Sequence, residues 1–204
     1  MNSNVDKYLV SNCAAIILAA GQSSRLGSPK QLLSYKGKNL LQHTIDVARQ
    51  ASLHPVIVVL GSGYEAVING IDITGIHIVN NNDWQTGMAS SIRCGIQALQ
   101  DIIPIPDATI LMVCDQPFVT PSLLNKLLSA QHSTGKPIVA SKYEDTIGTP
   151  ALFHQSFFPQ LLELTGDSGD KKIMLQYQEQ LMTVPFPLGD IDIDTTDDYK
   201  SLEK

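Results

Sequence analysis

Residues 14–30 join an apolar run of strand length to a loop of small and cationic residues. The run reads Ala14-Ala15-Ile16-Ile17-Leu18-Ala19-Ala20-Gly21-Gln22-Ser23-Ser24-Arg25-Leu26-Gly27-Ser28-Pro29-Lys30. Gly21 and Gly27 lack a Cβ, so the backbone can turn sharply and approach a ligand closely. Backbone N–H groups in such a loop form a concave donor surface that suits phosphate oxygens. Because Arg25 and Lys30 add two positive charges beside it, the loop predicts a polyphosphate site.

Two common phosphate loops do not fit this segment. A P-loop needs Gly-x-x-x-x-Gly-Lys-Ser/Thr, but here Gly27 is followed by Ser28 and Pro29. A dinucleotide fingerprint needs Gly-x-Gly-x-x-Gly, and Ser23 occupies the position of its second glycine. The alternative to a ligand site is a glycine-rich turn with two incidental surface cations.

Asp115 follows an apolar run, residues 109–114, and precedes Gln116 and Pro117. A carboxylate at the end of an apolar strand is costly to desolvate unless a cation or a donor meets it. Mg²⁺ prefers one or two carboxylates together with substrate phosphates. We therefore expect Asp115 to bind Mg²⁺, or Mn²⁺ in its place; the alternative is an Asx turn near Pro117.

Asp190, Asp192 and Asp194 alternate with Ile191 and Ile193 near the end of the sequence. A strand has a side-chain period of two, so this pattern predicts three carboxylates on one face and two isoleucines facing the core. Three adjacent like charges repel one another, and a divalent cation would relieve that repulsion. The alternative is a solvated edge strand ahead of a helix.

Residues 82–93 lead from a polar loop into a helix that begins near Gly87, Ser90 and Ser91. Free N–H groups and hydroxyls at a helix start suit the edge of a nucleotide base or an acceptor phosphate. The plainer interpretation makes both serines ordinary residues of the first helical turn and Trp84 a packing residue.

Strand-like runs alternate with amphipathic stretches along the chain, which is typical of a mostly parallel, doubly wound sheet. We expect strands at 13–19, 55–60, 76–79, 109–114, 137–140, 149–153 and 181–184, with a loop at 141–148 and a strand leading into a last helix over 191–199. We expect helices from 40, after 63, and over 89–99, 120–130 (with Thr120 as N-cap and Pro121 behind it), 156–164 and 171–177. Ligands of such sheets bind at the carboxyl ends of the strands, where each polar cluster falls.

The composition is ordinary for a soluble globular protein. The 204 residues are 43% hydrophobic and 17% charged, which suits one domain, 1–204, with residues 1–12 as a short N-terminal extension. A net charge of −6 argues against nucleic acid or an anionic membrane as a partner. There is no bilayer-length apolar run and no signal-peptide pattern. The three cysteines predict buried free thiols and a cytoplasmic location.

Four segments resemble motifs of the molybdenum cofactor cytidylyltransferase-like (MobA/MocA-like) NTP transferases. Residues 18–30 resemble Leu-Ala-Ala-Gly-x-Ser-x-Arg-Met-Gly-x-Pro-Lys, with Leu26 where Met is usual. Residues 114–117 resemble Gly/Cys-Asp-Gln-Pro, and 87–91 resemble a Ser-Ser loop that lines the family's nucleotide pocket. Residues 192–198 resemble Asp-Ile-Asp-Thr-Pro-Glu-Asp, with Thr196 in place of Pro. With the acceptor segments below, the resemblance extends from Ala14 to about Tyr199.

This resemblance implies a Rossmann-like three-layer α/β/α fold with a mostly parallel central sheet, the nucleotide-diphospho-sugar transferase fold. It implies that Asp115 and Asp192 hold the metal, that Asp194 supports them, and that Arg25, Lys30 and Asp115 are catalytic. The nucleotide-binding residues that it implies are Leu18, Ala19, Ala20, Gly21, Ser23, Arg25, Lys30, Gly87, Ser90 and Ser91. The Ala19-Ala20-Gly21 core, where guanosine-specific relatives carry Ala-Gly-Gly, favours CTP.

Two further segments resemble the acceptor side of the family. Gly148 and Pro150 match Gly-x-Pro-x-Leu-Phe. Gly166, Asp167, Gly169 and Lys171 match Gly-Asp-x-Gly-Ala-Arg, with Asp170 at the Ala position and Lys171 at the Arg position. Lysine binds phosphate but lacks the planar fork of arginine. The alternative for residues 166–169 is a plain turn between helices.

The resemblance as a whole implies a metal-dependent nucleotidyltransferase. It would transfer CMP from CTP to a phosphorylated acceptor, with molybdopterin favoured, and release pyrophosphate; a molybdoenzyme is then a candidate recipient of the product. A sugar- or alditol-phosphate nucleotidyltransferase is the alternative within the enzyme class. A nucleotide- or pterin-binding carrier without turnover is the alternative from another class.

Overall fold

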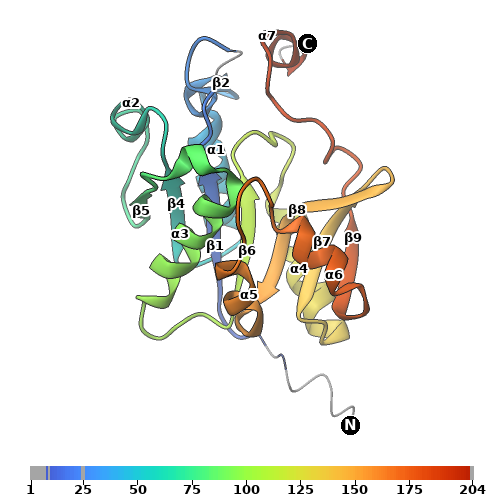
Figure 1. Ribbon diagram of the computed structural model, residues 1–204. Coiled ribbons are helices and arrows are strands. Elements are labelled where there is room, and N and C mark those ends of the chain that lie inside the picture. The colour runs from blue at the N-terminus through green and yellow to red at the C-terminus, as the bar shows by residue number, and fades with distance from the viewer. Residues whose placement is uncertain (1–7, 9, 24–25, 203–204) are drawn as a thin grey trace.

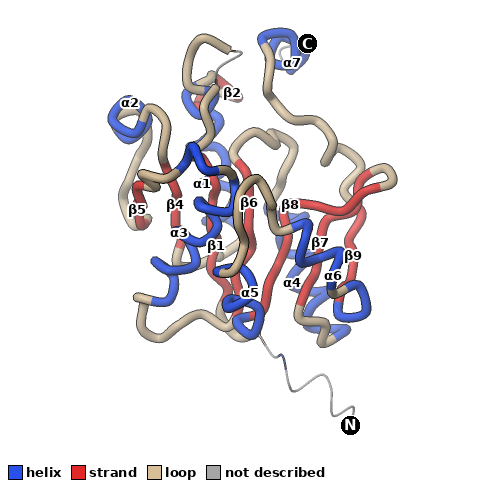
Figure 2. Tube along the Cα trace, viewed as in Figure 1, coloured by secondary structure: helices blue, strands red, loops and turns tan. Residues whose placement is uncertain are grey.

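The computed structural model describes residues 8, 10–23 and 26–202, and its chain trace is drawn in Figures 1 and 2. Its centre is a seven-stranded sheet in the order β5-β4-β1-β6-β8-β7-β9. The strands are β1 (Cys13–Ala19), β4 (Val56–Leu60), β5 (His77–Asn80), β6 (Ala108–Val113), β7 (Ile138–Tyr143), β8 (Thr146–His154) and β9 (Leu181–Pro185). Neighbours are parallel except at β6–β8 and β7–β8. The expected mostly parallel sheet is confirmed. A small hairpin of β2 (Ser34–Tyr35) and β3 (Lys38–Asn39) lies outside this sheet.

Helices cover both faces of the sheet and give the three layers seen in Figure 1. One face carries α1 (Leu40–Gln50) and α4 (Pro121–Thr134), and the other carries α3 (Met88–Gln100), α5 (Phe158–Leu162) and α6 (Lys171–Gln176). The remaining helices are α2 (Tyr64–Ile68) and α7 (Thr196–Leu202), with 3-10 turns η2 (Lys30–Leu32), η3 (Trp84–Thr86), η4 (Gln155–Phe157) and η5 (Gln178–Gln180). Thr120 caps α4 as expected, because its hydroxyl accepts a hydrogen bond from Leu123 N at 3.2 Å.

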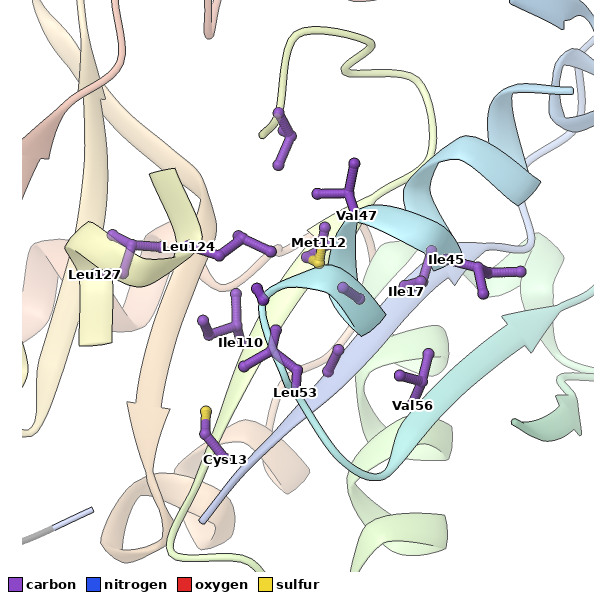
Figure 3. Close-up of a cluster of buried hydrophobic side chains, with 14 of the residues drawn as sticks. Cys13, Ile17, Ile45, Val47, Leu53, Val56, Ile110, Met112, Leu124 and Leu127 are labelled. Carbon is purple, nitrogen blue, oxygen red and sulfur yellow. The ribbon is translucent and has the colours of Figure 1, made fainter. Parts of the chain in front are cut away.

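Strand β1 is buried on both faces, which explains its unbroken apolar run. Ala15, Ile17 and Ala19 pack into the cluster beneath α1 and α4, part of which is drawn in Figure 3. Ile16 and Leu18 pack on the opposite face, beneath α3 and α5. Alternate residues of one strand therefore belong to two hydrophobic clusters.

The cysteine and membrane expectations can be compared with the described residues. Cys13, Cys94 and Cys114 are free thiols; Cys13 and Cys114 are buried, and Cys94 is half-buried. Among the helices described in this chain, none is long and apolar enough to cross a membrane.

Two expectations about strands are wrong. The expected loop 141–148 is the paired end of a β-hairpin, in which Tyr143 pairs with Thr146 around a two-residue turn. Antiparallel pairing satisfies the backbone N–H and C=O groups of these residues, although their side chains do not follow an apolar pattern. Residues 191–194 form no strand. Instead they reach the carboxyl end of β6, where Ile193 N donates a hydrogen bond to Asp115 O at 3.0 Å.

Candidate active site

A cavity of about 440 Å³ opens at the carboxyl ends of β1 and β6. These strands are parallel neighbours with Leu18 opposite Val113, so the loop after β1 and the segment holding Asp115 leave the sheet side by side. The cavity is lined by Leu18, Ala19, Ala20, Gly21, Gln22, Lys30, Gln31, Trp84, Gln85, Gly87, Met88, Ser91, Val113, Cys114, Asp115 and Asp167. Most of the nucleotide-binding residues expected from the sequence therefore meet around one cavity.

Lys30 is the cation at the mouth of this cavity. Its Nζ lies 2.5 Å from Asp115 Oδ2 and 2.9 Å from Asp194 Oδ1. The side chains of Lys30 and Asp115 are only 14% and 18% exposed, whereas that of Asp194 is 54% exposed. Burial alone would lower the pKa of Lys30, but the neighbouring Asp115 and Asp194 carboxylates raise it above its ordinary value, so the ammonium stays charged.

Asp192 completes a group of three carboxylates beside Lys30. Partial desolvation, together with the negative charges of Asp115 and Asp194, raises the pKa of Asp192 to about 6, although the residue keeps contact with solvent. Within the residues that the structure describes, no three His, Cys, Asp or Glu side chains lie close enough to hold a metal ion unaided. Asp115 Oδ1 is buried and has no hydrogen-bond partner among the described residues. A site of two carboxylates completed by substrate phosphates fits these residues, because Mg²⁺ and Mn²⁺ accept oxygen ligands of both kinds.

A buried glutamine, Gln31, stabilises the loop after β1 through hydrogen bonds to its backbone. Gln31 Nε2 donates to Ala19 O at 2.7 Å and to Gly21 O at 3.3 Å, and Lys30 N donates to Ser23 Oγ at 2.7 Å. Gly27 has a φ of 70°, a conformation that favours glycine. Sequence reasoning missed Gln31, for which a polar residue next to Lys30 was the one weak signal. Arg25 lies outside the described residues, so its expected role stays a prediction.

The two serines at the start of α3 have different surroundings. Ser91 lines the cavity, whereas Ser90 Oγ donates to Gly87 O at 2.8 Å and does not line it. Both hydroxyls accept hydrogen bonds from the buried side-chain amide of Asn81, at 2.8 Å to Ser90 and 3.0 Å to Ser91. Sequence reasoning did not single out Asn81, which lies in an asparagine-rich loop without a motif of its own.

The loop 166–170 packs on the start of α3. Ala89 N donates to Gly166 O at 3.2 Å, and a Cβ at Gly87 would lie 2.5 Å from Asp167 Oδ1. A Cβ at Gly169 would lie 3.0 Å from Met88 Sδ. Of the residues expected to bind the acceptor, Asp167 lines the cavity, and Gly166 and Gly169 bring its loop there.

The other expected acceptor residues lie further along the sheet. A Cβ at Gly148 would lie 2.1 Å from the hydroxyl of Tyr143, and Pro150 O accepts a hydrogen bond from Ser141 Oγ at 2.7 Å. Lys171 Nζ donates to Thr146 Oγ1 and lines a separate hollow, so the structure does not bring it to the cavity.

Tyr143 was not expected from the sequence to matter. Its pKa is raised by burial and by the charges of Asp192 and Asp170, so its hydroxyl lies within the field of these carboxylates. Gln116 lies nearby and is fixed by two bonds: its Nε2 donates to Gly189 O at 2.8 Å, and its Oε1 accepts from Thr149 Oγ1 at 3.2 Å. Tyr143, Gln116 and Asp192 therefore place hydroxyl, amide and carboxyl groups near Asp115, although none of the three lines the cavity.

Comparisons with known proteins identify the family and the fold. A family model described as MobA-like NTP transferase domain matches residues 15–181. The crystal structure of Rv0371c from Mycobacterium tuberculosis H37Rv is 34% identical, with a TM-score of 0.82, over 95% of this chain and 98% of that one. Its complex with manganese is 31% identical, with a TM-score of 0.78 over the same shares, 95% and 98%.

Two further proteins are similar to this chain at lower identity. Nicotine blue oxidoreductase of Paenarthrobacter nicotinovorans is 27% identical over 172 residues, which are 79% of this chain and 80% of that protein. The 4-diphosphocytidyl-2C-methyl-D-erythritol synthase of Anaerococcus prevotii is 18% identical, with a TM-score of 0.70, over 99% of this chain and 97% of that one. At that identity the likeness concerns the fold alone, which is the expected nucleotide-diphospho-sugar transferase fold.

Proposed function

This chain belongs to the MobA-like NTP transferase domain family, and from that premise we propose that it transfers a nucleotidyl group from a nucleoside triphosphate to a phosphorylated acceptor, releasing pyrophosphate. The observation that carries the proposal is the cluster at the cavity mouth. There Lys30 bridges Asp115 and Asp194, next to an Asp115 oxygen that is buried and has no hydrogen-bond partner in the part of the chain that the structure describes. Fixed positive charge beside unpaired carboxylate oxygen suits a polyphosphate bound through a divalent metal.

In the proposed reaction a phosphate oxygen of the acceptor attacks the α-phosphorus. The bond between the α-phosphorus and the bridging oxygen breaks, and pyrophosphate leaves with that electron pair. No side-chain nucleophile takes part, so catalysis consists of positioning and charge stabilisation. Asp115 and Asp192 would hold Mg²⁺ or Mn²⁺, which would neutralise negative charge on the phosphates.

The chain's own residues account for the rest of the proposed mechanism. Gln31 fixes the backbone of Ala19 and Gly21, which forms the floor of the phosphate site. Lys30 would exchange its contact with Asp115 for the triphosphate and stabilise the departing pyrophosphate. We further propose CTP as donor, because of the Ala19-Ala20-Gly21 core, and molybdopterin as acceptor, with a molybdoenzyme receiving the product.

A sugar or alditol phosphate is the second candidate acceptor, and the polar groups near Asp115 favour it. Lys171, the cation expected to bind an acceptor phosphate, donates to Thr146 Oγ1 and lines another hollow. Tyr143 and Asp192 present hydroxyl and carboxylate groups instead. Such groups suit an acceptor rich in hydroxyls.

Pyrophosphate release tests the proposal. Each of the four NTPs is incubated with Mg²⁺ or Mn²⁺ and with molybdopterin or a panel of sugar and alditol phosphates. We expect release with at least one pair, and at least a 100-fold loss in Asp115→Asn, the scale of a lost electrostatic contact to a transition state. Asp197→Asn, at an exposed residue of α7, is the matched control and should retain activity.

Two outcomes would contradict the proposal. Nucleotide binding without pyrophosphate release for every pair would favour the carrier. Because one relative is named an oxidoreductase, NADH and NADPH oxidation is followed in parallel, and turnover there without pyrophosphate would replace the proposed reaction.

A further inference from the structure

The side chain of Asn81 is 3% exposed, and its hydrogen bonds fix which way its amide points. Its Oδ1 accepts a hydrogen bond from Asp83 N at 2.9 Å. A backbone N–H can only donate, so the oxygen faces Asp83 and the NH₂ group faces the serines of α3. The backbone of Asn81 is held as well, because its N–H donates to Leu60 O at 2.8 Å.

The two protons of this NH₂ group determine the direction of both serine hydroxyls. Nδ2 lies 2.8 Å from Ser90 Oγ and 3.0 Å from Ser91 Oγ, so each serine oxygen accepts one hydrogen bond. Ser90 then donates its own proton to Gly87 O at 2.8 Å. Within the part of the chain that the structure describes, Ser91 Oγ makes no hydrogen bond other than the one it accepts.

The Ser91 hydroxyl proton is therefore left to donate into the cavity that Ser91 lines. A hydroxyl is ordinarily ambivalent, since it can donate or accept as its ligand requires. Here the amide of Asn81 occupies one of the two acceptor positions of the Ser91 oxygen and directs the proton away from Asn81, because turning the proton toward Nδ2 would oppose two donors. The pair therefore favours the Ser91 hydroxyl as a hydrogen-bond donor to a ligand.

The position of Ser91 in the cavity indicates which part of a nucleotide it meets. Lys30, Asp115 and the backbone of Gly21 lie at the phosphate end, after β1 and β6. Ser91, Trp84 and Met88 come from η3 and α3, which form the other wall. A triphosphate held at the first end leaves its nucleoside toward the second.

We propose that Asn81 is a specificity-determining positioning residue, which fixes the Ser91 hydroxyl as a donor to a hydrogen-bond acceptor on the nucleobase. Ring nitrogen N3 and carbonyl O2 of cytosine are such acceptors, whereas guanine carries N–H donors at the opposing positions N1 and N2 and has its one acceptor on that edge at O6. This inference rests on the proposed function, since it assumes that the cavity binds a nucleoside triphosphate.

Calorimetric titration with Mg²⁺, without acceptor, tests the pair. The ligands are CTP, GTP and inorganic tripolyphosphate, which has no base. Ser91→Ala removes the donor, and we expect it to weaken CTP binding about tenfold, the net value of one hydrogen bond. Tripolyphosphate binding should change by less than about twofold.

Asn81→Asp reverses the polarity, because a carboxylate accepts hydrogen bonds from both serines and turns the Ser91 proton inward. We expect this variant to weaken CTP binding about tenfold more than tripolyphosphate binding. The loss of tripolyphosphate binding measures the repulsion by the added negative charge. In a Ser91→Ala background that extra factor should vanish. Asn80→Asp places the same charge on the adjacent exposed residue and should not discriminate between the ligands.

Three results would overturn the inference. The first is an unchanged CTP affinity in Ser91→Ala. The second is an equal loss of affinity for CTP and for tripolyphosphate in either single variant. The third is a double variant whose loss of CTP affinity equals the product of the losses in the two single variants. If the unaltered protein binds no nucleotide at all, the proposed function fails and takes this inference with it. Ser91→Ala removes only one oxygen atom, so it decides the matter even if Asn81→Asp does not fold.

Discussion

At the residue scale, Lys30 occupies the space between carboxylates that a metal would also use. Its ammonium lies within 3 Å of both Asp115 and Asp194 (2.5 and 2.9 Å), and it neutralises part of the charge that would attract a cation. Metal binding before the nucleotide arrives must therefore compete with this ion pair. A triphosphate would give Lys30 another partner, so metal and nucleotide should bind more tightly together than either does alone.

The variant Lys30→Met separates two effects of the ammonium: its competition with the metal for the carboxylates and its binding of the triphosphate. We expect the nucleotide-free variant to bind Mn²⁺ about tenfold more tightly, because the positive charge next to the Asp115 and Asp194 carboxylates is gone. Pyrophosphate release should nevertheless fall steeply. Electron paramagnetic resonance of free Mn²⁺ measures the affinity, with Lys38→Met, at a lysine paired with Asp46, as the control. Weaker Mn²⁺ binding in Lys30→Met would refute the competition.

Asp170 gives a second prediction, about stability. The carboxyl group is buried, its Oδ2 has no hydrogen-bond partner within residues 10–23 and 26–202 or at residue 8, and desolvation raises its pKa to about 6 from 3.8. The folded protein therefore binds this proton more tightly than the unfolded chain does. The contribution to stability is fully present below about pH 4 and is lost as the pH rises to about 6.

The variant Asp170→Asn should not lose stability as the pH rises, because its side chain carries no charge. At pH 8 we expect the free energy of unfolding to rise by roughly 1–3 kcal/mol, the upper figure being two pKa units at 1.36 kcal/mol each. At pH 4 the two proteins should differ little. Urea unfolding at both pH values measures this, and an equal change at both would show that ionisation is not the cause.

At the element scale, the start of α3 and loop 166–170 depend on a glycine. Gly87 has a φ of 106°, and a Cβ there would lie 2.4 Å from Gly166 O. Gly87→Ala should cost more than 2 kcal/mol of stability, because strain and steric clash add. It should also weaken nucleotide binding, since Ser91 and Asp167 would be displaced together. Thermal unfolding and titration with CTP measure the two effects.

Gly75→Ala is the matched control for this prediction. Gly75 also has a positive φ, of 67°, but a Cβ there would meet nothing within 4 Å. We expect it to lose about 1 kcal/mol from backbone strain alone, with nucleotide affinity unchanged. Equal losses in the two variants would mean that the contact between α3 and loop 166–170 contributes little.

The local sequence pattern predicted which side chains are buried better than it predicted which segments pair as strands. The alternation at 191–194 correctly gave a buried Ile193 with exposed Asp192 and Asp194, yet the segment pairs with no strand. Side-chain period depends on the segment itself, whereas pairing depends on which backbone lies beside it. Likewise Tyr143 is paired in the hairpin because of Thr146 across the turn, not because of an apolar pattern.

At the scale of the whole molecule, topology decided which predicted site residues meet. Asp115 lies beside the loop after β1 because β1 and β6 are parallel neighbours, as the rule about strand ends anticipates. Lys171 follows no such rule: it begins a helix, and its side chain turns to Thr146. Asn81 and Gln31 act by holding other residues, and such support has no sequence pattern when its partners are distant in the chain.

The two hydrophobic clusters share one sheet, and this has a consequence for unfolding. Alternate residues of β1 belong to opposite clusters, so unpairing this strand removes packing from both faces at once. Neither layer of helices can then keep its core while the other melts. We expect a single cooperative transition, with equal calorimetric and van't Hoff enthalpies, which would also support the prediction of one domain.

Ligand binding should move that transition as a whole. With Mn²⁺ and CTP near 100 times their dissociation constant, mass action adds about 2.7 kcal/mol, or about 5–10 °C for a chain of this length. The cavity lies between the loop after β1, the start of α3 and the end of β6, so the stabilised elements belong to both clusters. Differential scanning calorimetry tests this directly. Two transitions, of which the ligand moves only one, would mean that the layers unfold separately and that the shared sheet does not couple them.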